Sequence, residues 1–164
     1  MVTVKRIVFP TDFSPAAAHA LEHAMSVALE HRAKMYLVHV IEDIGFVPPF
    51  TLTPTSAIEE YHHGIIELAE QNLRKLMSLQ VRQQIEVEEV VVEGKAFVEI
   101  LRIAKEKKAD LIVMATHGRT GRIHTLLGST SERVIGRATC PVLAVPYPDT
   151  EILAQQKLLS QASN

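Results

Sequence analysis

The residues of this chain best suited to hold an anion follow an apolar run at 110–115. A glycine loop comes after the run, and three hydroxyl residues then stand at the start of a short helical pattern. Backbone N–H groups in such a loop, together with hydroxyls, donate hydrogen bonds to phosphate oxygens. The pattern favours a phosphate site, although glycines that only make turns would produce the same pattern. The candidate residues are His117, Gly118, Gly128, Ser129, Thr130 and Ser131.

The charge of this segment differs from that of the whole chain. The formal net charge is -2, whereas residues 117–137 carry four arginines (Arg119, Arg122, Arg133 and Arg137) against one acid, Glu132. A general nucleic-acid binder shows a basic face or stacking aromatics, and this chain has interspersed charges and only 5% aromatic residues. We therefore expect no nucleic-acid partner, and we expect any anionic partner to be small.

Strands and helices alternate along the chain, and they must position these residues. Apolar runs predict strands at 7–9, 34–41, 86–93, 110–115 and 142–145. Helical spacing predicts helices at 16–31, 58–83 and 97–107, and a short one after Gly128. The alternation predicts a doubly wound, Rossmann-like α/β fold, in which helices cover both faces of a five-stranded parallel sheet. Polar content in 86–93 and prolines around 142–145 indicate edge strands.

Length and composition limit the class of protein. The 164 residues fit one α/β domain at 1–148 and a weakly helical tail at 149–164. The single Cys140 excludes an internal disulfide. There is no signal-peptide core before Asp12, and no apolar run approaches the about 20 residues that a membrane helix needs. We expect a cytoplasmic protein without a membrane partner, in which the long loop at 42–56 acts as a lid.

Catalytic and metal-binding constellations are not evident in the sequence. His19 and His23 have the four-residue spacing of zinc ligands, but no Cys or carboxylate completes a site. We interpret His31, His39 and the pair at 62–63 as surface or half-buried side chains. A Walker loop, a nucleophile elbow and the acids and lysine of a phosphorelay receiver are all missing from the sequence. We therefore predict no catalytic residues and no metal ligands.

Two segments give the chain a resemblance to a known family. The first is Phe9-Pro10-Thr11-Asp12-Phe13-Ser14, and the second is Ala115-Thr116-His117-Gly118, followed nine residues later by Gly128-Ser129. With these, the chain resembles the nucleotide-binding branch of the universal stress protein family over about residues 4 to 146. That branch has Gly-x-x-Gly, nine residues, then Gly and Ser or Thr. Ala115 stands where the pattern has its first glycine. Its added methyl group would lower the affinity for a nucleotide without preventing binding.

The resemblance implies a role for each matching residue. It implies a parallel sheet with strand order 3-2-1-4-5 and an adenine nucleotide, ATP or ADP or AMP, at the carboxyl edge between strands one and four. Asp12, next to Pro10 and Thr11, would accept hydrogen bonds from the ribose or adenine side, and Val40 would offer backbone contacts to adenine. Met114 and Ala115 would line the base and sugar. The phosphate contacts would be His117, Gly118, Gly128, Ser129, Thr130 and Ser131, with Arg119 as a further clamp.

Simpler roles remain open for three of these residues. Asp12 and Ser129 have the side chains that cap helices, and His117 could anchor its loop by a hydrogen bond. Mg²⁺ would accompany a triphosphate, although no carboxylate cluster demands it. The family also implies a two-fold homodimer in which the fifth strand pairs antiparallel with its copy. The strand residues are Val142, Leu143, Ala144 and Val145.

Three functions are consistent with this sequence. We expect an ATP-binding stress-response or regulatory protein, in which the loops after strands one and four hold the nucleotide. The alternative is a dimeric scaffold of the same fold that binds no nucleotide and acts through its dimer surface and the apolar loop at 46–50. A second alternative is a slow ATPase, or an enzyme that phosphorylates itself on Ser129 or Thr130.

Overall fold

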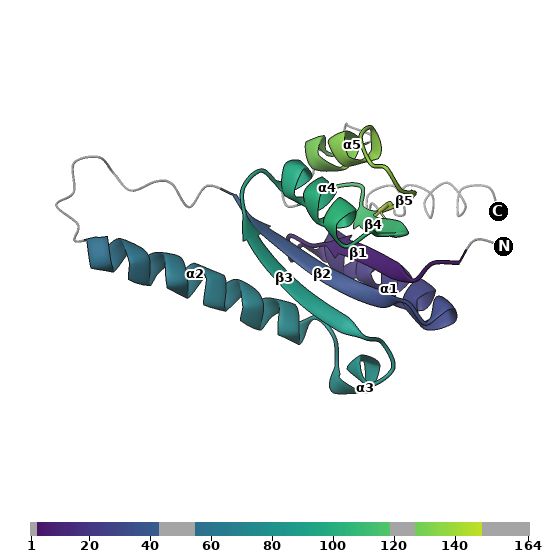
Figure 1. Cartoon of the computed structure of the whole chain (residues 1–164), viewed down its shortest axis with the longest axis horizontal. Helices are drawn as coiled ribbons and strands as arrows, with labels where there is room; N and C mark the ends of the chain where they lie inside the picture. Colours follow the sequence, from purple (N-terminus) through teal and green to yellow (C-terminus); the bar gives the residue numbers. More distant parts are fainter. Residues whose placement is uncertain (1–2, 43–54, 119–126, 149–164) are drawn as a thin grey trace, which may run out of the picture.

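Five parallel strands form the sheet, in the order β3-β2-β1-β4-β5. The computed structural model describes residues 3–42, 55–118 and 127–148 (Figure 1). The order and the parallel pairing confirm the fold predicted from the sequence, including the edge positions of β3 and β5. The strands are β1 (Arg6–Pro10), β2 (Lys34–Ile41), β3 (Val87–Glu93), β4 (Leu111–Ala115) and β5 (Val142–Val145).

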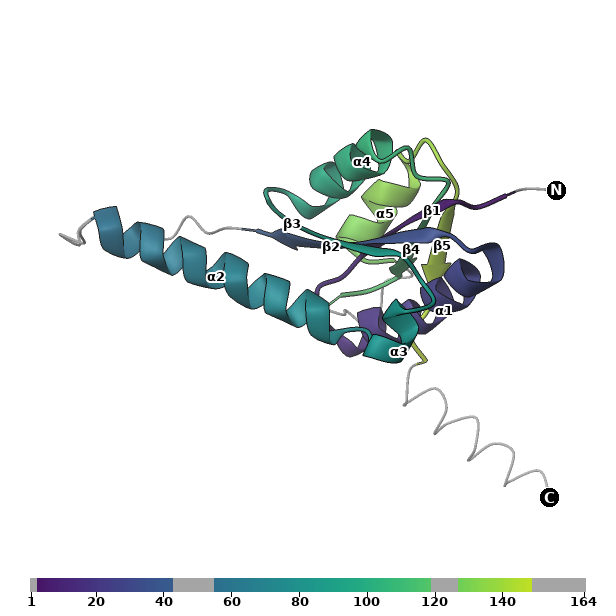
Figure 2. The ribbon, with the colours of Figure 1, turned by 60° about the horizontal axis from the view of Figure 1, so that its bottom comes forward.

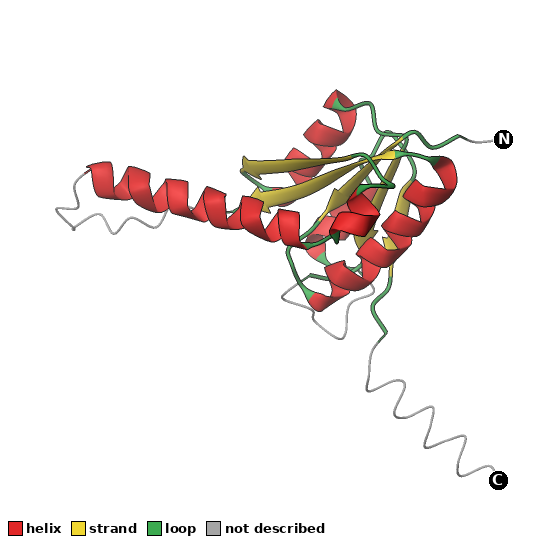
Figure 3. Cartoon of the chain, turned by 90° about the horizontal axis from the view of Figure 1, so that it is seen from below, coloured by secondary structure: helices red, strands yellow, loops and turns green. Residues whose placement is uncertain are grey.

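Helices cover both faces of the sheet. Figure 2 shows α4 and α5 above the strands and α1, α2 and α3 below them, and Figure 3 shows α2 extending past the sheet. Among the described residues, no helix combines the length and apolar composition that crossing a bilayer requires. The helices are α1 (Pro15–His31), α2 (Thr55–Lys75), α3 (Leu79–Arg82), α4 (Ala96–Glu106) and α5 (Ser129–Ile135).

The central strands are buried on both faces, as their continuous apolar sequences require. Alternate side chains of a strand point to opposite faces, so β1 contributes to two cores. Phe9 packs with Leu37 and Leu73 in a core between the sheet and helices α1 and α2. Val8 packs with Ile103 and Ile112 in a second core, between the sheet and helices α4 and α5. Each of these six side chains is at most 2% exposed.

One helix prediction was wrong in part. The helix expected at 58–83 is two helices, α2 and α3, and α2 begins at Thr55, inside the predicted loop at 42–56. The apolar spacing continues through the break, so periodicity alone does not reveal it. Ser78 caps α3 by accepting a hydrogen bond from the Val81 amide at 3.4 Å. The Arg82 guanidinium donates to backbone carbonyls at the end of α2, including that of Leu73 at 3.2 Å, which satisfies groups that a helix end leaves unpaired.

Three sequence predictions fall on residues that the structure does not describe. The proposed lid lies mostly at 43–54, the clamp Arg119 lies at 119–126, and the helical tail lies at 149–164. These predictions are therefore not assessed by the fold.

Ion pairs and charged hydrogen bonds fasten the amino-terminal end of the sheet. The Asp110 carboxylate accepts hydrogen bonds from the amides of Lys5 and Arg6, both at 2.9 Å, and pairs with the Arg6 guanidinium at 3.4 Å. Burial alone would raise the pKa of Asp110, but these three donors outweigh it and hold the pKa below its ordinary value. At Glu88 on β3, ammonium groups of Lys107 and Lys34 likewise lower the pKa of the carboxyl.

The lowered pKa of Asp110 predicts a pH-dependent stability. The carboxylate stabilises the fold fully above its unfolded pKa of about 4, and this contribution is lost as pH falls through the lower folded pKa. We expect Asp110→Asn to reduce the free energy of unfolding by about 1–2 kcal/mol at pH 7 and to lose less stability than the wild type below pH about 4. Urea unfolding from pH 7 to pH 3 measures both. Glu30→Gln, at an exposed position of α1, is the control, and a parallel pH profile for Asp110→Asn and wild type would contradict the prediction.

Candidate functional site

A cavity of about 620 Å³ opens at the carboxyl ends of β1, β2 and β4. The order of the strands reverses here, because β1 pairs with β2 on one side and with β4 on the other. Loops diverge from such a point and leave a crevice where ligands of doubly wound sheets bind. The cavity is within the range of about 300–1,000 Å³ typical of small-molecule sites.

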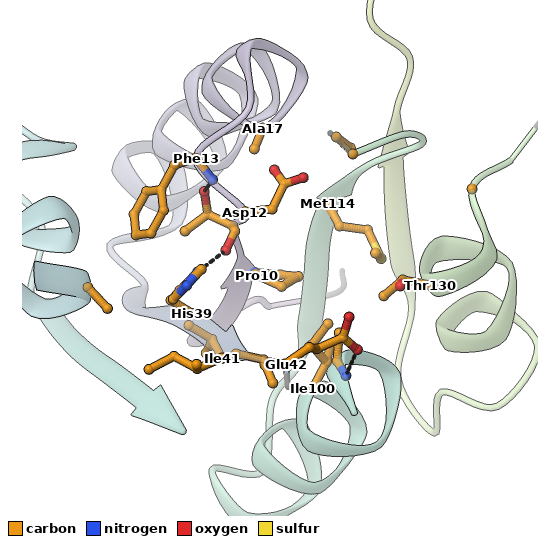
Figure 4. Close-up of a pocket in the computed structure, with 18 of the residues that line it drawn as sticks. Pro10, Asp12, Phe13, Ala17, His39, Ile41, Glu42, Ile100, Met114 and Thr130 are labelled. Atoms are coloured by element: carbon orange, nitrogen blue, oxygen red, sulfur yellow. Dashed lines mark hydrogen bonds between the residues drawn. The ribbon is translucent and has the colours of Figure 1, made fainter. Parts of the chain in front are cut away.

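Asp12 belongs to the loop that follows β1 and lies at the centre of this cavity, where it faces the loop that follows β4 (Figure 4). Its Oδ1 accepts a hydrogen bond from the Ser14 amide at 3.0 Å. Its Oδ2 lies only 2.5 Å from the position that a Cβ would take on Gly118. A side chain at position 118 would therefore displace the Asp12 carboxylate from this place.

The loop after β1 is held in an unusual conformation. Phe13 has φ of 62°, in the left-handed region that costs a non-glycine residue about 1–2 kcal/mol. The Phe13 amide donates to the Thr11 Oγ1 at 3.0 Å, and Thr11 is buried. Thr11 thus fixes the turn that aims Asp12 into the cavity. The N-cap of α1 is Ser14, which accepts from the Ala17 amide, so Asp12 does not cap this helix.

His39 lines the same cavity, a role that the sequence analysis missed. Its Nδ1 lies 2.8 Å from the Thr11 carbonyl oxygen, and its ring stacks on Phe13 with 4.4 Å between centroids. A carbonyl oxygen only accepts, so Nδ1 carries the proton and donates. The signal that could have found this residue is its place near the carboxyl end of β2, next to the strand-order reversal.

The loops before and after the undescribed segment 119–126 meet at a second close approach. The Gly128 amide donates to the Thr116 carbonyl oxygen at 2.7 Å. A Cβ on Gly128 would lie 3.2 Å from that oxygen, which is tighter than an ordinary contact. Gly128 is also the N-cap of α5, without a side-chain cap, so Ser129 does not cap this helix. His117 contacts Thr116, its Nδ1 lying 3.0 Å from the threonine Oγ1, which agrees with a loop-anchoring role.

The three hydroxyl residues of α5 have different environments. Ser131 is 2% exposed, and its Oγ lies 2.6 Å from the Thr116 oxygen and 2.8 Å from the Gly128 oxygen. One hydroxyl proton serves one acceptor at a time, and either choice ties α5 to the loop. Ser129 is exposed and Thr130 is half-buried, and both line the cavity. Ser131 therefore acts mainly on the loop, whereas Ser129 and Thr130 are placed to meet a ligand.

The residues singled out in the sequence come together in space. Apart from Arg119, which lies outside the described residues, all of them line this one cavity. The sequence analysis did not identify further lining residues from the loop after β1, from β2 and its end, from α2 and from α4, because a sequence pattern does not show which side chains face a crevice. Those that it missed include Phe13, His39, Ile41, Glu42, Leu68 and Ile100.

In the described part of the cavity, the hydrogen-bond donors are backbone N–H groups and uncharged side chains. No lysine or arginine is among its described lining residues. Its carboxylates there are Asp12 and Glu42, and the Glu42 Oε1 accepts from the Ala96 amide at 2.6 Å, at the start of α4. In the described ranges, no three His, Cys, Asp or Glu side chains are grouped to hold a metal ion. An anion here would be held by N–H and hydroxyl dipoles.

Comparison with known proteins gives consistent matches over nearly the whole chain. The model of the Universal stress protein family matches residues 3–146. Universal stress protein MJ0531 of Methanocaldococcus jannaschii is 38% identical over 148 residues, which cover 90% of this chain and 85% of that protein. The solved structure of hypothetical protein MJ0577, whose sequence comes from the same organism, has a TM-score of 0.77 at 30% identity and covers 90% of this chain and 99% of that one.

Two less similar solved structures share the fold and contain nucleotides. One is a universal stress protein in complex with cAMP, with a TM-score of 0.58 and 24% identity, covering 88% of this chain and 98% of that chain. The other, from Archaeoglobus fulgidus, is in complex with dAMP, with a TM-score of 0.52, 24% identity and the same coverage. At this identity the comparison establishes a common fold.

The contrast between the serines of α5 gives a stability prediction. Ser131→Ala removes a buried hydroxyl that bonds a carbonyl oxygen, so we expect the free energy of unfolding to fall by about 1 kcal/mol. The matched control Ser129→Ala changes an exposed position and should alter it by less than about 0.5 kcal/mol. Chemical denaturation measures both variants. Equal effects of the two substitutions would show that Ser131 does not fasten the loop.

Proposed function

The chain belongs to the universal stress protein family, and on that premise we propose that it binds an adenine nucleotide, foremost ATP, in the cavity at the carboxyl edge of the sheet. One observation carries the proposal: residues matching the family's nucleotide motif, from segments far apart in the sequence, line a single cavity. The nucleotide would lie between the loops that follow β1 and β4. Its occupancy would then serve a regulatory role in the response to stress.

The phosphates would bind beside Gly118 and Gly128. Neither glycine has a side chain that would cover its neighbouring amides, and the first-turn amides of α5 have no partner within their own helix. The hydroxyls of Ser129 and Thr130 add donors, and His117 lies at the same edge. Ser131 would hold the loop in shape, because its hydroxyl is directed to backbone carbonyls. Arg119 remains a proposed clamp from the sequence alone.

The sugar and base would bind on the other side of Asp12. The Asp12 carboxylate can accept hydrogen bonds from ribose hydroxyls. Pro10, Met114 and Ile100 offer apolar surface to the adenine ring, and the backbone of Val40 offers it hydrogen bonds. Ala115 closes β4 in ordinary strand conformation, and its side chain packs against the core under α1. The family's first glycine is therefore not demanded here by the backbone.

The solved structures support the class of ligand. Two proteins of this fold are in complex with cAMP and dAMP, which share the adenine base. Mg²⁺ would accompany a triphosphate and be held chiefly by the phosphates, because the described residues group no three His, Cys, Asp or Glu side chains to hold a metal ion.

We extend the proposal to a homodimer formed through β5. This strand pairs with β4 on one side, and its other edge has no strand beside it among the described residues. Leu143 of β5 is 39% exposed, and Tyr147, two residues after the strand, is 47% exposed. An exposed strand edge pairs readily with a second chain, and a two-fold axis would place β5 antiparallel to its copy.

The close approach of Asp12 and Gly118 gives a binding prediction. Gly118→Ala would push the carboxylate aside, so we expect its affinity for ATP to fall about tenfold or more, a loss of about 1.4 kcal/mol. The matched control is Gly64→Ala on α2, where an added Cβ would meet nothing within 4 Å. Isothermal titration of the folded protein with ATP, ADP and AMP measures the affinities. A separate sample is denatured first, so that any nucleotide carried through purification is released and identified.

Two results would contradict the nucleotide proposal. A wild-type protein that carries no nucleotide and shows no saturable heat with ATP, ADP or AMP would favour the scaffold without a nucleotide. Equal affinities of the wild type and Gly118→Ala would place the nucleotide elsewhere.

The β5 edge gives a prediction on assembly. Leu143→Arg would put a charge into the proposed strand pair, so we expect a dimeric wild type to become a monomer. Leu79→Arg, on the side chain of α3 that is 79% exposed, is the control and should leave the mass unchanged. Light scattering coupled to gel filtration measures the mass. A dimer that survives Leu143→Arg would exclude β5 as the interface.

A further inference from the structure

The cavity continues past the proposed nucleotide contacts into a region next to α2. We call this region the α2 lobe, and none of its residues is among those that the family motif assigns to the nucleotide. It takes residues from the loop after β1, from α1, from β2 and from α2. Its apolar walls are Phe13, Ala17, Ile41, Ile65, Leu68 and Ala69, with His39 and Asn72 as its polar groups.

The alternation of side chains along β2 separates the α2 lobe from the nucleotide side. Leu37 packs in the core under α1 and α2, whereas Val38 and Val40 pack with the core under α4 and α5. His39 and Ile41 share the face of Leu37, because every second residue of a strand points the same way. Figure 4 shows Phe13, His39 and Ile41 on one side of Asp12, with Met114 and Thr130 on the other.

The walls of the α2 lobe are suited to an apolar molecule. Ala17, Ile41 and Ala69 are at most 8% exposed and form its floor. Leu68, which also lines it, leaves 57% of its surface in water. An apolar occupant would cover this leucine and gain the free energy of removing apolar surface from water.

The polar groups of the α2 lobe restrict the occupant further. His39 already donates through Nδ1 to the Thr11 carbonyl, which fixes its ring against Phe13. Asn72 is half-buried on α2 and brings a carboxamide that can donate and accept. Among the described residues, those that line the lobe include no lysine, arginine or carboxylate side chain. An ion would therefore find no opposite charge there, whereas a neutral molecule with a hydrogen-bonding group would find a partner.

We propose that the α2 lobe is a second ligand site, which takes a small uncharged molecule with an aliphatic or aromatic body and one hydrogen-bonding group. The site lies beside the nucleotide, and Asp12 and the loop after β1 separate the two. Its ligand contacts come from the loop after β1, from α1, from β2 and from α2. Ligand binding there requires no contact with Gly118, Gly128 or α5.

The test uses the neutral fluorescent probe N-phenyl-1-naphthylamine, whose emission rises in apolar surroundings. The chain has no tryptophan, so its own fluorescence interferes little. We expect saturable binding of one probe per chain to the wild type. Ala69→Phe would fill the lobe and should weaken the probe's binding about tenfold or more, while Ala18→Phe, at an exposed position of α1, is the matched control.

A second variant guards against the possibility that Ala69→Phe, at a buried position, disturbs the fold. Leu68→Lys changes an exposed side chain, so the fold should tolerate it, and it places a charge beside the apolar walls. We expect it also to weaken probe binding about tenfold. Circular dichroism checks that both variants are folded, and both should keep the wild-type affinity for ATP within about twofold.

The outcomes separate this inference from the proposed function. Unsaturable probe binding, wild-type probe affinity in both lobe variants, or complete displacement of the probe by ATP would each overturn the second site. Probe binding that the lobe variants abolish, in a protein that binds no adenine nucleotide, would leave the second site standing and remove the nucleotide proposal.

Discussion

The reversal of strand order around β1 is the constraint on which the site depends. β1 pairs with β2 on one side and with β4 on the other, and its residues Ile7, Val8 and Phe9 are at most 1% exposed. A strand buried on both faces must be apolar throughout, so polar residues can follow only where it ends. The loops after β1 and β4 leave the sheet in different directions and leave the cavity between them.

Close backbone approach sets the shape of that cavity. Gly118 admits the Asp12 carboxylate, and Gly128 brings its amide to the Thr116 carbonyl. The turn at Phe13, held by Thr11, shapes the loop after β1, and the buried Ser131 ties α5 to the loop after β4. The site is thus assembled from backbone positions and short polar side chains, which suits recognition of a ligand through hydrogen bonds to N–H groups and hydroxyls.

The strand β2 lines both parts of the cavity, the proposed nucleotide side and the apolar α2 lobe. β2 contributes Val40 to the proposed nucleotide side and His39 and Ile41 to the α2 lobe, because neighbours on a strand face opposite ways. The same short segment therefore contacts both proposed ligands. The undescribed residues 43–54 follow directly after Ile41 and Glu42, which line the cavity.

The sequence by itself determined the fold class, and through its family resemblance it also gave the expected strand order and the members of the motif-bearing loops. Apolar runs, helical spacing and glycines are local properties that a strand or turn imposes on its own residues. It did not reveal the break at Ser78, because the apolar period runs through it. The tertiary structure alone showed that His39, Ile41 and Leu68 face the cavity, that Ser131 bonds the loop and that Gly118 makes room for Asp12. These facts depend on which distant segments meet, and a local pattern carries no information about such meetings.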